Sequence, residues 1–299
     1  MNSETMIDMS APILTKRDTL GTLCVRINRQ CNLACSYCRA GSSPEFREQI
    51  DHEKLKRFLL NAQRKLGLKH VSISGGEPGI EKRLPDFVVN LLDAGLFVSI
   101  TTNGTTNLAS RMRKIFRDYP SRIRMRVSID GDTALHDAFR GSGTFAKARE
   151  EVFAFKDAGA WVGINTVVFP ATVLKADAVI ACVGELGANQ WALITPVPEG
   201  SAAGEPWLAS EIVYSVMRLF EKVRHTNYSG SVKIWNFIGT PHTSVLIKSN
   251  GELVIAGVRS DDHHRLGSID NYNFDDIASA IDLAESTNEK CFFSWAGWH

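Results

Sequence analysis

Three cysteines stand close together in the first part of the chain, Cys31, Cys35 and Cys38. Thiolates at this spacing bind iron–sulfur clusters or zinc, and both kinds of site normally take four protein ligands. The other three cysteines are isolated along the chain. The spacing therefore favours a cluster in which one iron is left open for a ligand from outside the protein. A zinc site completed by His52 is the alternative.

A glycine-rich run, Ser74-Gly75-Gly76-Glu77-Pro78, follows an expected strand about forty residues later. Together with the cysteine run, in which Tyr37 directly precedes the third cysteine, it resembles the radical S-adenosylmethionine (SAM) superfamily. The resemblance implies a 4Fe–4S cluster on Cys31, Cys35 and Cys38, with SAM on the open iron. It also implies SAM contacts from Tyr37, Gly75, Gly76 and Glu77. Glu77 or a neighbouring carbonyl group would accept a hydrogen bond from the methionyl ammonium.

Two further polar runs, 101–104 and 127–131, end the next two expected strands. They match the branch that includes the molybdenum-cofactor cyclase and the SPASM-like peptide-modifying enzymes. By that resemblance Ser128 and Arg140 hold the methionyl carboxylate, Asn103 lies at the cofactor, and Asp130 bonds a ribose or substrate hydroxyl. An ordinary Asn-Gly turn for Asn103 and a helix N-cap for Asp130 are the alternatives.

Strands alternate with helical patterns over residues 22–195, which predicts parallel strands joined by right-handed crossovers. We expect an α/β fold, a partial (β/α)6 TIM-like barrel, with its chemistry at the carboxyl ends of the strands. Asn250-Gly251 predicts a hairpin, which a helix follows. The expected parts are a tail over 1–20, the radical SAM barrel over 21–228, and a substrate-capping extension over 229–299 that lacks a full cysteine set for auxiliary clusters.

The resemblance implies a 5′-deoxyadenosyl radical that removes hydrogen from an unactivated C–H bond. The chain's size and layout resemble radical epimerases of aminoglycoside antibiotics of the neomycin type, which implies isomerase activity on a cationic aminosugar. Candidate acidic residues for that substrate are Asp130, Glu199, Glu205, Asp261 and Asp262. A reductant such as flavodoxin would supply electrons. A radical SAM enzyme acting on a ribosomal peptide or a nucleotide remains the alternative, as does a non-enzymatic iron–sulfur or zinc binding module.

An epimerase of this kind needs a hydrogen-atom donor, usually a cysteine thiol. Ser249 and, second, Ala256 lie on the hairpin expected at the barrel mouth, and either position is a candidate for a replaced cysteine. Cys182 and Cys291 are the donors to consider otherwise. His263 and His264 stand in a polar run and are expected to be exposed rather than to act as metal ligands or as an acid–base pair.

Composition excludes several classes. The 299 residues carry a formal net charge of +1, so nothing indicates nucleic-acid binding. Residues 201–299 hold 12 acidic and 8 basic residues, a net charge of −4 that weakly favours a cationic substrate. No apolar run is long enough to span a bilayer. Isolated cysteines and the lack of a signal-peptide pattern indicate a reducing, cytoplasmic location.

Overall fold

The structure is a computed structural model that describes residues 21–203, 209–235, 237, 245–256 and 263–281. Its centre is one sheet with the strand order β10-β9-β8-β1-β2-β3-β4-β5-β6-β7. Neighbours from β8 to β7 are parallel, whereas β9 runs antiparallel to β8 and β10 antiparallel to β9. The strands are β1 (Thr22–Arg26), β2 (His70–Ser74), β3 (Phe97–Thr102), β4 (Ile123–Ser128), β5 (Trp161–Val167), β6 (Gln190–Ile194), β7 (Ser231–Trp235), β8 (Val245–Ile247), β9 (Glu252–Ile255) and β10 (His264–Ser268).

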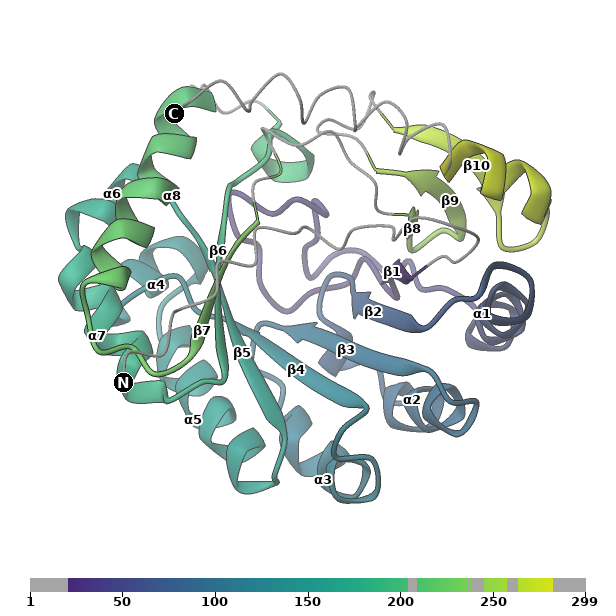
Figure 1. Ribbon diagram of the computed structural model, residues 1–299, viewed down its shortest axis with the longest axis horizontal. Coiled ribbons are helices and arrows are strands. Elements are labelled where there is room, and N and C mark those ends of the chain that lie inside the picture. Colours follow the sequence, from purple (N-terminus) through teal and green to yellow (C-terminus); the bar gives the residue numbers. More distant parts are fainter. Residues whose placement is uncertain (1–20, 204–208, 236, 238–244, 257–262, 282–299) are drawn as a thin grey trace.

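Helices cover the outer side of the curved sheet (Figure 1). They include α1 (His52–Leu66), α2 (Leu84–Asp93), α3 (Leu108–Asp118), α4 (Thr133–Arg140), α5 (Thr144–Asp157), α6 (Pro170–Leu174), α7 (Ala176–Leu186) and α8 (Ala209–Arg224). Residues 274–281 are also helical. α1 shows why the sequence sets such limits: the Asp51 side chain accepts hydrogen bonds at its first turn, and Gly67 ends it with φ of 63°. No helix in the described ranges is long and apolar enough to cross a membrane.

The two faces of the sheet differ in polarity. On the outer face, strand side chains such as Leu23 and Val25 of β1 are completely buried in the main apolar core. The inner face carries polar groups that bond to one another, as His70 does with Ser99. Because successive residues of a strand point to opposite faces, this alternation leaves a polar inner wall beside the strand ends where the site lies.

The expected fold is confirmed: the sheet is a partial barrel with an antiparallel hairpin extension. Two strands were not predicted. β7 adds a further parallel strand beside β6, and β10 pairs with β9. Each lies at an edge of the described sheet, where a strand pairs on one side only. The sequence of β10 is polar and gives a weak strand pattern. That of β7 alternates polar and apolar residues, but over only five positions.

Candidate active site

The cysteine loop, residues 31–38, follows β1 and is fastened to the end of β2. The amide of Gly76 donates to the carbonyl oxygen of Asn28 at 2.8 Å, and the amide of Glu77 donates to that of Gln30 at 2.9 Å. A Cβ at Gly76 would lie 2.0 Å from the Gln30 carbonyl oxygen. Glycine is therefore required at position 76 for the end of β2 to approach the chain that leads into the loop.

The thiols of the loop receive N–H donors from the protein. The amide of Leu33 lies 3.4 Å from Cys31 Sγ, the amide of Ser42 lies 3.4 Å from Cys38 Sγ, and Asn103 Nδ2 lies 3.7 Å from Cys31 Sγ. Hydrogen bonds of this kind tune the potential of iron–sulfur clusters. Burial, together with the charges of Glu77 and the other two thiols, raises the pKa of Cys31 to about 11. A bound metal would offset that cost, because it favours the thiolate.

The geometry suits a cluster better than a single metal ion. Among the described residues, no three His, Cys, Asp or Glu side chains converge as ligands of one ion. A 4Fe–4S cluster does not require its ligands to converge on one ion, because each thiolate binds a different iron. His52, the possible fourth zinc ligand, is buried at the start of α1 with its ring 4.9 Å from that of Phe87.

Glu77 ties the end of β2 to the end of β3. Its carboxylate is completely buried and accepts from the Gly79 amide at 2.8 Å, the Thr102 hydroxyl at 2.6 Å and the Asn103 amide at 2.6 Å. Burial raises the pKa of Glu77, and these donors oppose the rise. Because both carboxylate oxygens have partners in the protein, the neighbouring carbonyl groups are better placed to accept from a cofactor ammonium.

Asp130, Arg140 and Tyr37 form a buried group beside the cysteine loop. Asp130 accepts from Arg140 Nε at 2.5 Å, from the Val167 amide at 3.0 Å and from the Tyr37 hydroxyl. Burial alone would raise the pKa of Asp130, but Arg140 and these bonds hold it below its usual value. Tyr37 packs against Phe139 and Phe169 at ring distances of 5.8 and 5.2 Å. Asp130 is completely buried, so it positions Arg140 rather than facing open space.

Ser128 closes the set of expected cofactor residues at the end of β4. It is half-buried, and its hydroxyl makes no hydrogen bond within the described part of the chain. Residues of the cysteine loop and the ends of β2, β3 and β4 thus come together at one rim of the barrel, as predicted for chemistry at the carboxyl ends of parallel strands.

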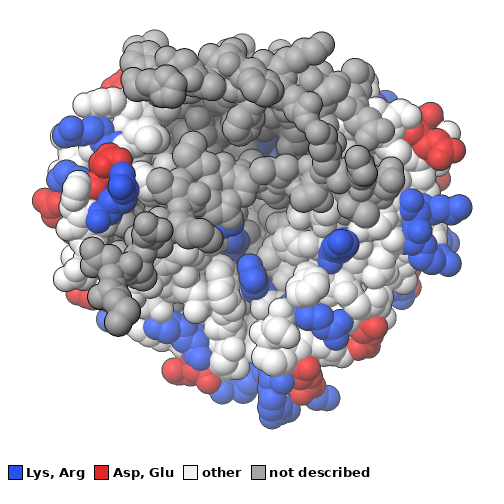
Figure 2. Space-filling view, viewed as in Figure 1, with Lys and Arg blue, Asp and Glu red and all other residues white. Residues whose placement is uncertain are grey.

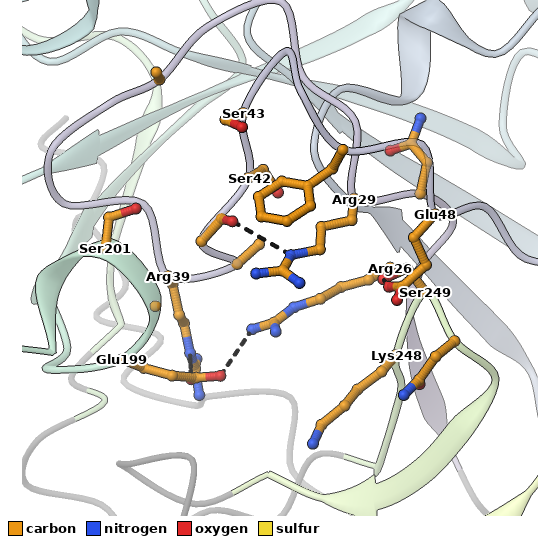
Figure 3. Close-up of a pocket in the computed structure, with 17 residues that line it drawn as sticks. Arg26, Arg29, Arg39, Ser42, Ser43, Glu48, Glu199, Ser201, Lys248 and Ser249 are labelled. Carbon is orange, nitrogen blue, oxygen red and sulfur yellow. Dashed lines mark hydrogen bonds and ion pairs between the residues drawn. The ribbon is translucent and has the colours of Figure 1, made fainter.

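A cavity of about 620 Å³ opens between the chain around the cysteine loop, the turn after β6 and the β8–β9 hairpin. Figure 3 shows Arg26, Arg39 and Glu199 meeting on one side of it, and Glu48 and Ser249 meeting on the other. Its charged lining residues are four basic and two acidic: Arg26, Arg29, Arg39, Lys248, Glu48 and Glu199. Figure 2 shows blue atoms, and no red ones among the described residues, in the central hollow of the molecule.

Glu199 is the most connected acidic group of this cavity. Its carboxylate lies 3.3 Å from Arg26 and 2.7 Å from Arg39, and 3.7 Å from the ring of His263. Burial would raise the pKa of Glu199, but the two arginines hold it below its usual value. Glu199 was predicted to contact a cationic substrate, but its negative charge is already paired with Arg26 and Arg39. Glu205, Asp261 and Asp262, the other three acidic candidates besides Asp130, lie outside the described residues.

The two candidate donor positions differ sharply. Ser249 lines the cavity, is 6% exposed and donates its hydroxyl hydrogen to Glu48. Ala256 instead packs with Leu246 and Val254 in a small apolar cluster. Because β9 runs antiparallel to β8, it carries Ala256 toward the opposite end of the barrel. The cavity therefore includes the first candidate and not the second. Cys182 lies in α7, half-buried, and Cys291 is outside the described residues.

Several cavity residues were not singled out by the sequence. Arg26 faces inward from β1, and a charged residue within a buried strand is the signal that points to it. Arg39 and Glu48 follow the cysteines in the sequence, but no sequence motif indicates that they line a cavity. His263, which lies 3.7 Å from the cavity residue Glu199, was expected to be exposed. Its side chain is only 3% exposed, and neither ring nitrogen has a hydrogen-bond partner among the described residues. His264 is exposed, as expected.

Comparison with known proteins agrees with this geometry. The sequence model described as the Radical SAM superfamily matches residues 25–175. An AdoMet-dependent heme synthase of Nitratidesulfovibrio vulgaris is 29% identical over 181 residues, 60% of this chain and 48% of that protein. A probable GTP 3′,8-cyclase of Pyrococcus horikoshii is 32% identical over 108 residues, 36% of this chain and 33% of that protein. The chain thus spans about half the length of the heme synthase and about a third of the length of the cyclase.

A solved structure shares the fold. Native anSMEcpe with bound AdoMet and the Cp18Cys peptide superposes with a TM-score of 0.66 and 19% identity, over 85% of this chain and 79% of that chain. Its partial barrel and C-terminal extension correspond to the architecture seen here.

Proposed function

Since the chain belongs to the radical SAM superfamily, and so uses a 4Fe–4S cluster and SAM, we propose that it removes a hydrogen atom from an unactivated C–H bond of a peptide or nucleotide substrate. The observation that carries the enzymatic assignment is the meeting of a three-cysteine loop with polar side chains from three further strand ends. A non-enzymatic binding module has no need of that arrangement, and a structural zinc site would need a fourth ligand.

The cluster and SAM together supply a 5′-deoxyadenosyl radical, and the protein supplies binding, orientation and exclusion of water. Cys31, Cys35 and Cys38 would hold three irons of the cluster. Arg140 is oriented by Asp130 through Nε and Nη2, which leaves its remaining donors for the methionyl carboxylate, together with the hydroxyl of Ser128. Asn103, Gly75 and Gly76 complete the proposed SAM site. A reduced flavodoxin is the electron donor that we expect.

The cavity supports the substrate class. Its described lining residues carry four positive and two negative charges, a net charge of +2 that attracts the carboxylates of a peptide or the phosphates of a nucleotide. Two of the three named proteins point the same way, because one is a probable GTP cyclase and one solved structure holds a peptide, whereas the third is a heme synthase. A polycationic aminoglycoside would meet the same net positive charge, of which Arg26 is paired with Glu199 and Lys248 with Glu252.

We test this with the anaerobically reconstituted full chain, SAM and dithionite, supplied in turn with GTP, a cysteine-containing peptide and neomycin C. The compound of the correct substrate class is expected to raise the formation of 5′-deoxyadenosine about tenfold above the level without substrate. The reason is that the radical then takes a hydrogen atom from the substrate and is converted to 5′-deoxyadenosine. A substrate deuterated at the reacting carbon should transfer its label to 5′-deoxyadenosine. A rise with neomycin C alone would contradict the peptide-or-nucleotide proposal and favour the aminosugar.

Epimerisation of an aminosugar is the second candidate, and the place of Ser249 is what favours it. A hydrogen atom returned to the opposite face of a sugar carbon must come from a donor inside the cavity. Position 249 lines the cavity, whereas position 256 is packed at the other end of the barrel.

The matched pair Ser249→Cys and Ala256→Cys tests this candidate. With neomycin C in deuterated buffer, the Ser249→Cys variant is expected to yield inverted product that carries one solvent deuterium, measured by mass spectrometry. The Ala256→Cys variant is expected to yield no more inverted product than the unsubstituted protein. Inversion with Ala256→Cys alone, or with neither variant, would overturn the assignment of position 249.

A further inference from the structure

The turn after β6 touches the cysteine loop although four strands separate β6 from β1 in the sheet. The amide of Ser201 donates to the carbonyl oxygen of Cys38 at 2.9 Å, and the amide of Gly41 donates to the same oxygen at 3.0 Å. Figure 3 shows Glu199 and Ser201 facing the chain that carries Arg39 and Ser42. The two segments meet across the mouth of the open barrel, so the contact joins the chain that follows β1 to the chain that follows β6.

Gly200 makes this close approach possible. A Cβ at position 200 would lie 2.4 Å from the carbonyl oxygen of Cys38, 2.5 Å from that of Arg39 and 2.6 Å from the amide nitrogen of Gly41. These neighbours are backbone atoms and cannot move aside as a side chain can. The residue also has φ of +66°, a conformation that favours glycine.

Glu199 fastens the same turn through charge. One carboxylate oxygen is 2.7 Å from Arg39 Nε, which belongs to the chain just after Cys38, and the other is 3.3 Å from Arg26 on β1. Glu199 is 3% exposed, so these pairs are poorly screened by water. Its negative charge and the positive charge of Arg39 both lie close to the position of Cys38.

We propose that the turn formed by Glu199, Gly200 and Ser201 is a positioning element for the cluster: it holds Cys38 from the opposite side of the barrel and sets part of the electrostatic field there. The inference rests on the proposed function, because it assumes a cluster on the cysteine loop. Since the turn also lines the cavity, a substrate bound there contacts the segment that holds a cluster ligand.

The first test compares Gly200→Ala with Gly95→Ala. Gly95 has φ of +87° and nothing within 4 Å of its Cβ position, so the control carries the conformational cost without the clash. Gly200→Ala is expected to bind less than half the iron of the unsubstituted protein after reconstitution, and Gly95→Ala the full amount. In the cluster-free protein, hydrogen exchange of amides 38–43 should be at least about tenfold faster in Gly200→Ala, because local opening frees them.

The second test keeps the backbone intact and remains informative if Gly200→Ala does not fold. Glu199→Gln removes a negative charge and should shift the midpoint potential of the cluster upward, whereas Arg39→Gln should shift it downward. Opposite shifts, together with iron loss in Gly200→Ala, support the proposal. Unchanged potentials in both variants, or full iron with unchanged exchange in Gly200→Ala, would overturn it. SAM cleavage by the unsubstituted protein would still stand, so failure of this inference is distinguishable from failure of the proposed function.

Discussion

Cys35→Ala is expected to bind less than about one iron per chain, against about four in the unsubstituted protein, and to lose all SAM cleavage. The three thiolates of the cysteine loop are the cluster ligands that the described part of the chain offers, so removal of one leaves two irons without a protein ligand. Iron and sulfide analysis after anaerobic reconstitution measures the effect, and the spectrum of the reduced protein by electron paramagnetic resonance confirms it.

Cys182→Ala is the matched control, since this thiol lies in α7 and its only described bond goes to the Gly131 carbonyl oxygen at 3.4 Å. Iron retention by Cys182→Ala is expected. Full iron in Cys35→Ala, or equal loss in both variants, would contradict the ligand assignment.

Arg140→Met is expected to lower the free energy of unfolding by about 3–5 kcal/mol, because it leaves the charge of Asp130 buried without its partner. Asp130 is completely buried and Arg140 Nε lies 2.5 Å from it. Urea unfolding of the cluster-free protein measures the loss without any contribution from SAM. The exposed Arg57, for which no contact is described, provides the control Arg57→Met, and there we expect a change within about 0.5 kcal/mol.

The stability difference between Arg140→Met and the unsubstituted protein should also depend on pH, in a direction that the pKa of Asp130 determines. The pKa of Asp130 is held below its usual value in the folded protein, so its contribution to stability is present above the unfolded pKa, about 3.9, and is lost as the pH falls through the folded pKa. Without Arg140 the buried carboxyl favours its neutral form. The stability difference between Arg140→Met and the unsubstituted protein should therefore narrow in acid. A difference that is constant between pH 7 and pH 4 would show that the lost interaction is not ionic.

The sequence predicted the parts of the protein that local pattern determines. The cysteine spacing and the glycine-rich run identify the cofactors, and alternation of strands and helices identifies the partial barrel. The Asn250-Gly251 hairpin also forms, with Gly251 at φ of 83°. In each case the deciding residues are neighbours in sequence, so their spacing carries the information.

The rest depends on contacts between distant segments. Glu199 pairs with Arg39, 160 positions away, and no local pattern announces that contact. His263 stands in a polar run, yet its side chain is buried because the fold brings it against Glu199. Gly200 looks like an ordinary loop glycine until the Cys38 carbonyl is seen beside it. Of the two edge strands, β10 has little apolar alternation to indicate it. β7 does alternate, with Val232 and Ile234 buried, but over only five residues.

Reductive cleavage of SAM is the most direct test of the central claim, that this chain uses a three-cysteine cluster for radical chemistry. The reconstituted protein is mixed anaerobically with SAM and dithionite, and 5′-deoxyadenosine and methionine are quantified by liquid chromatography, with Cys35→Ala in parallel. We predict equal amounts of both products from the unsubstituted protein and none above background from the variant. Absence of 5′-deoxyadenosine from protein that holds a full cluster, or its equal formation by Cys35→Ala, would contradict the account.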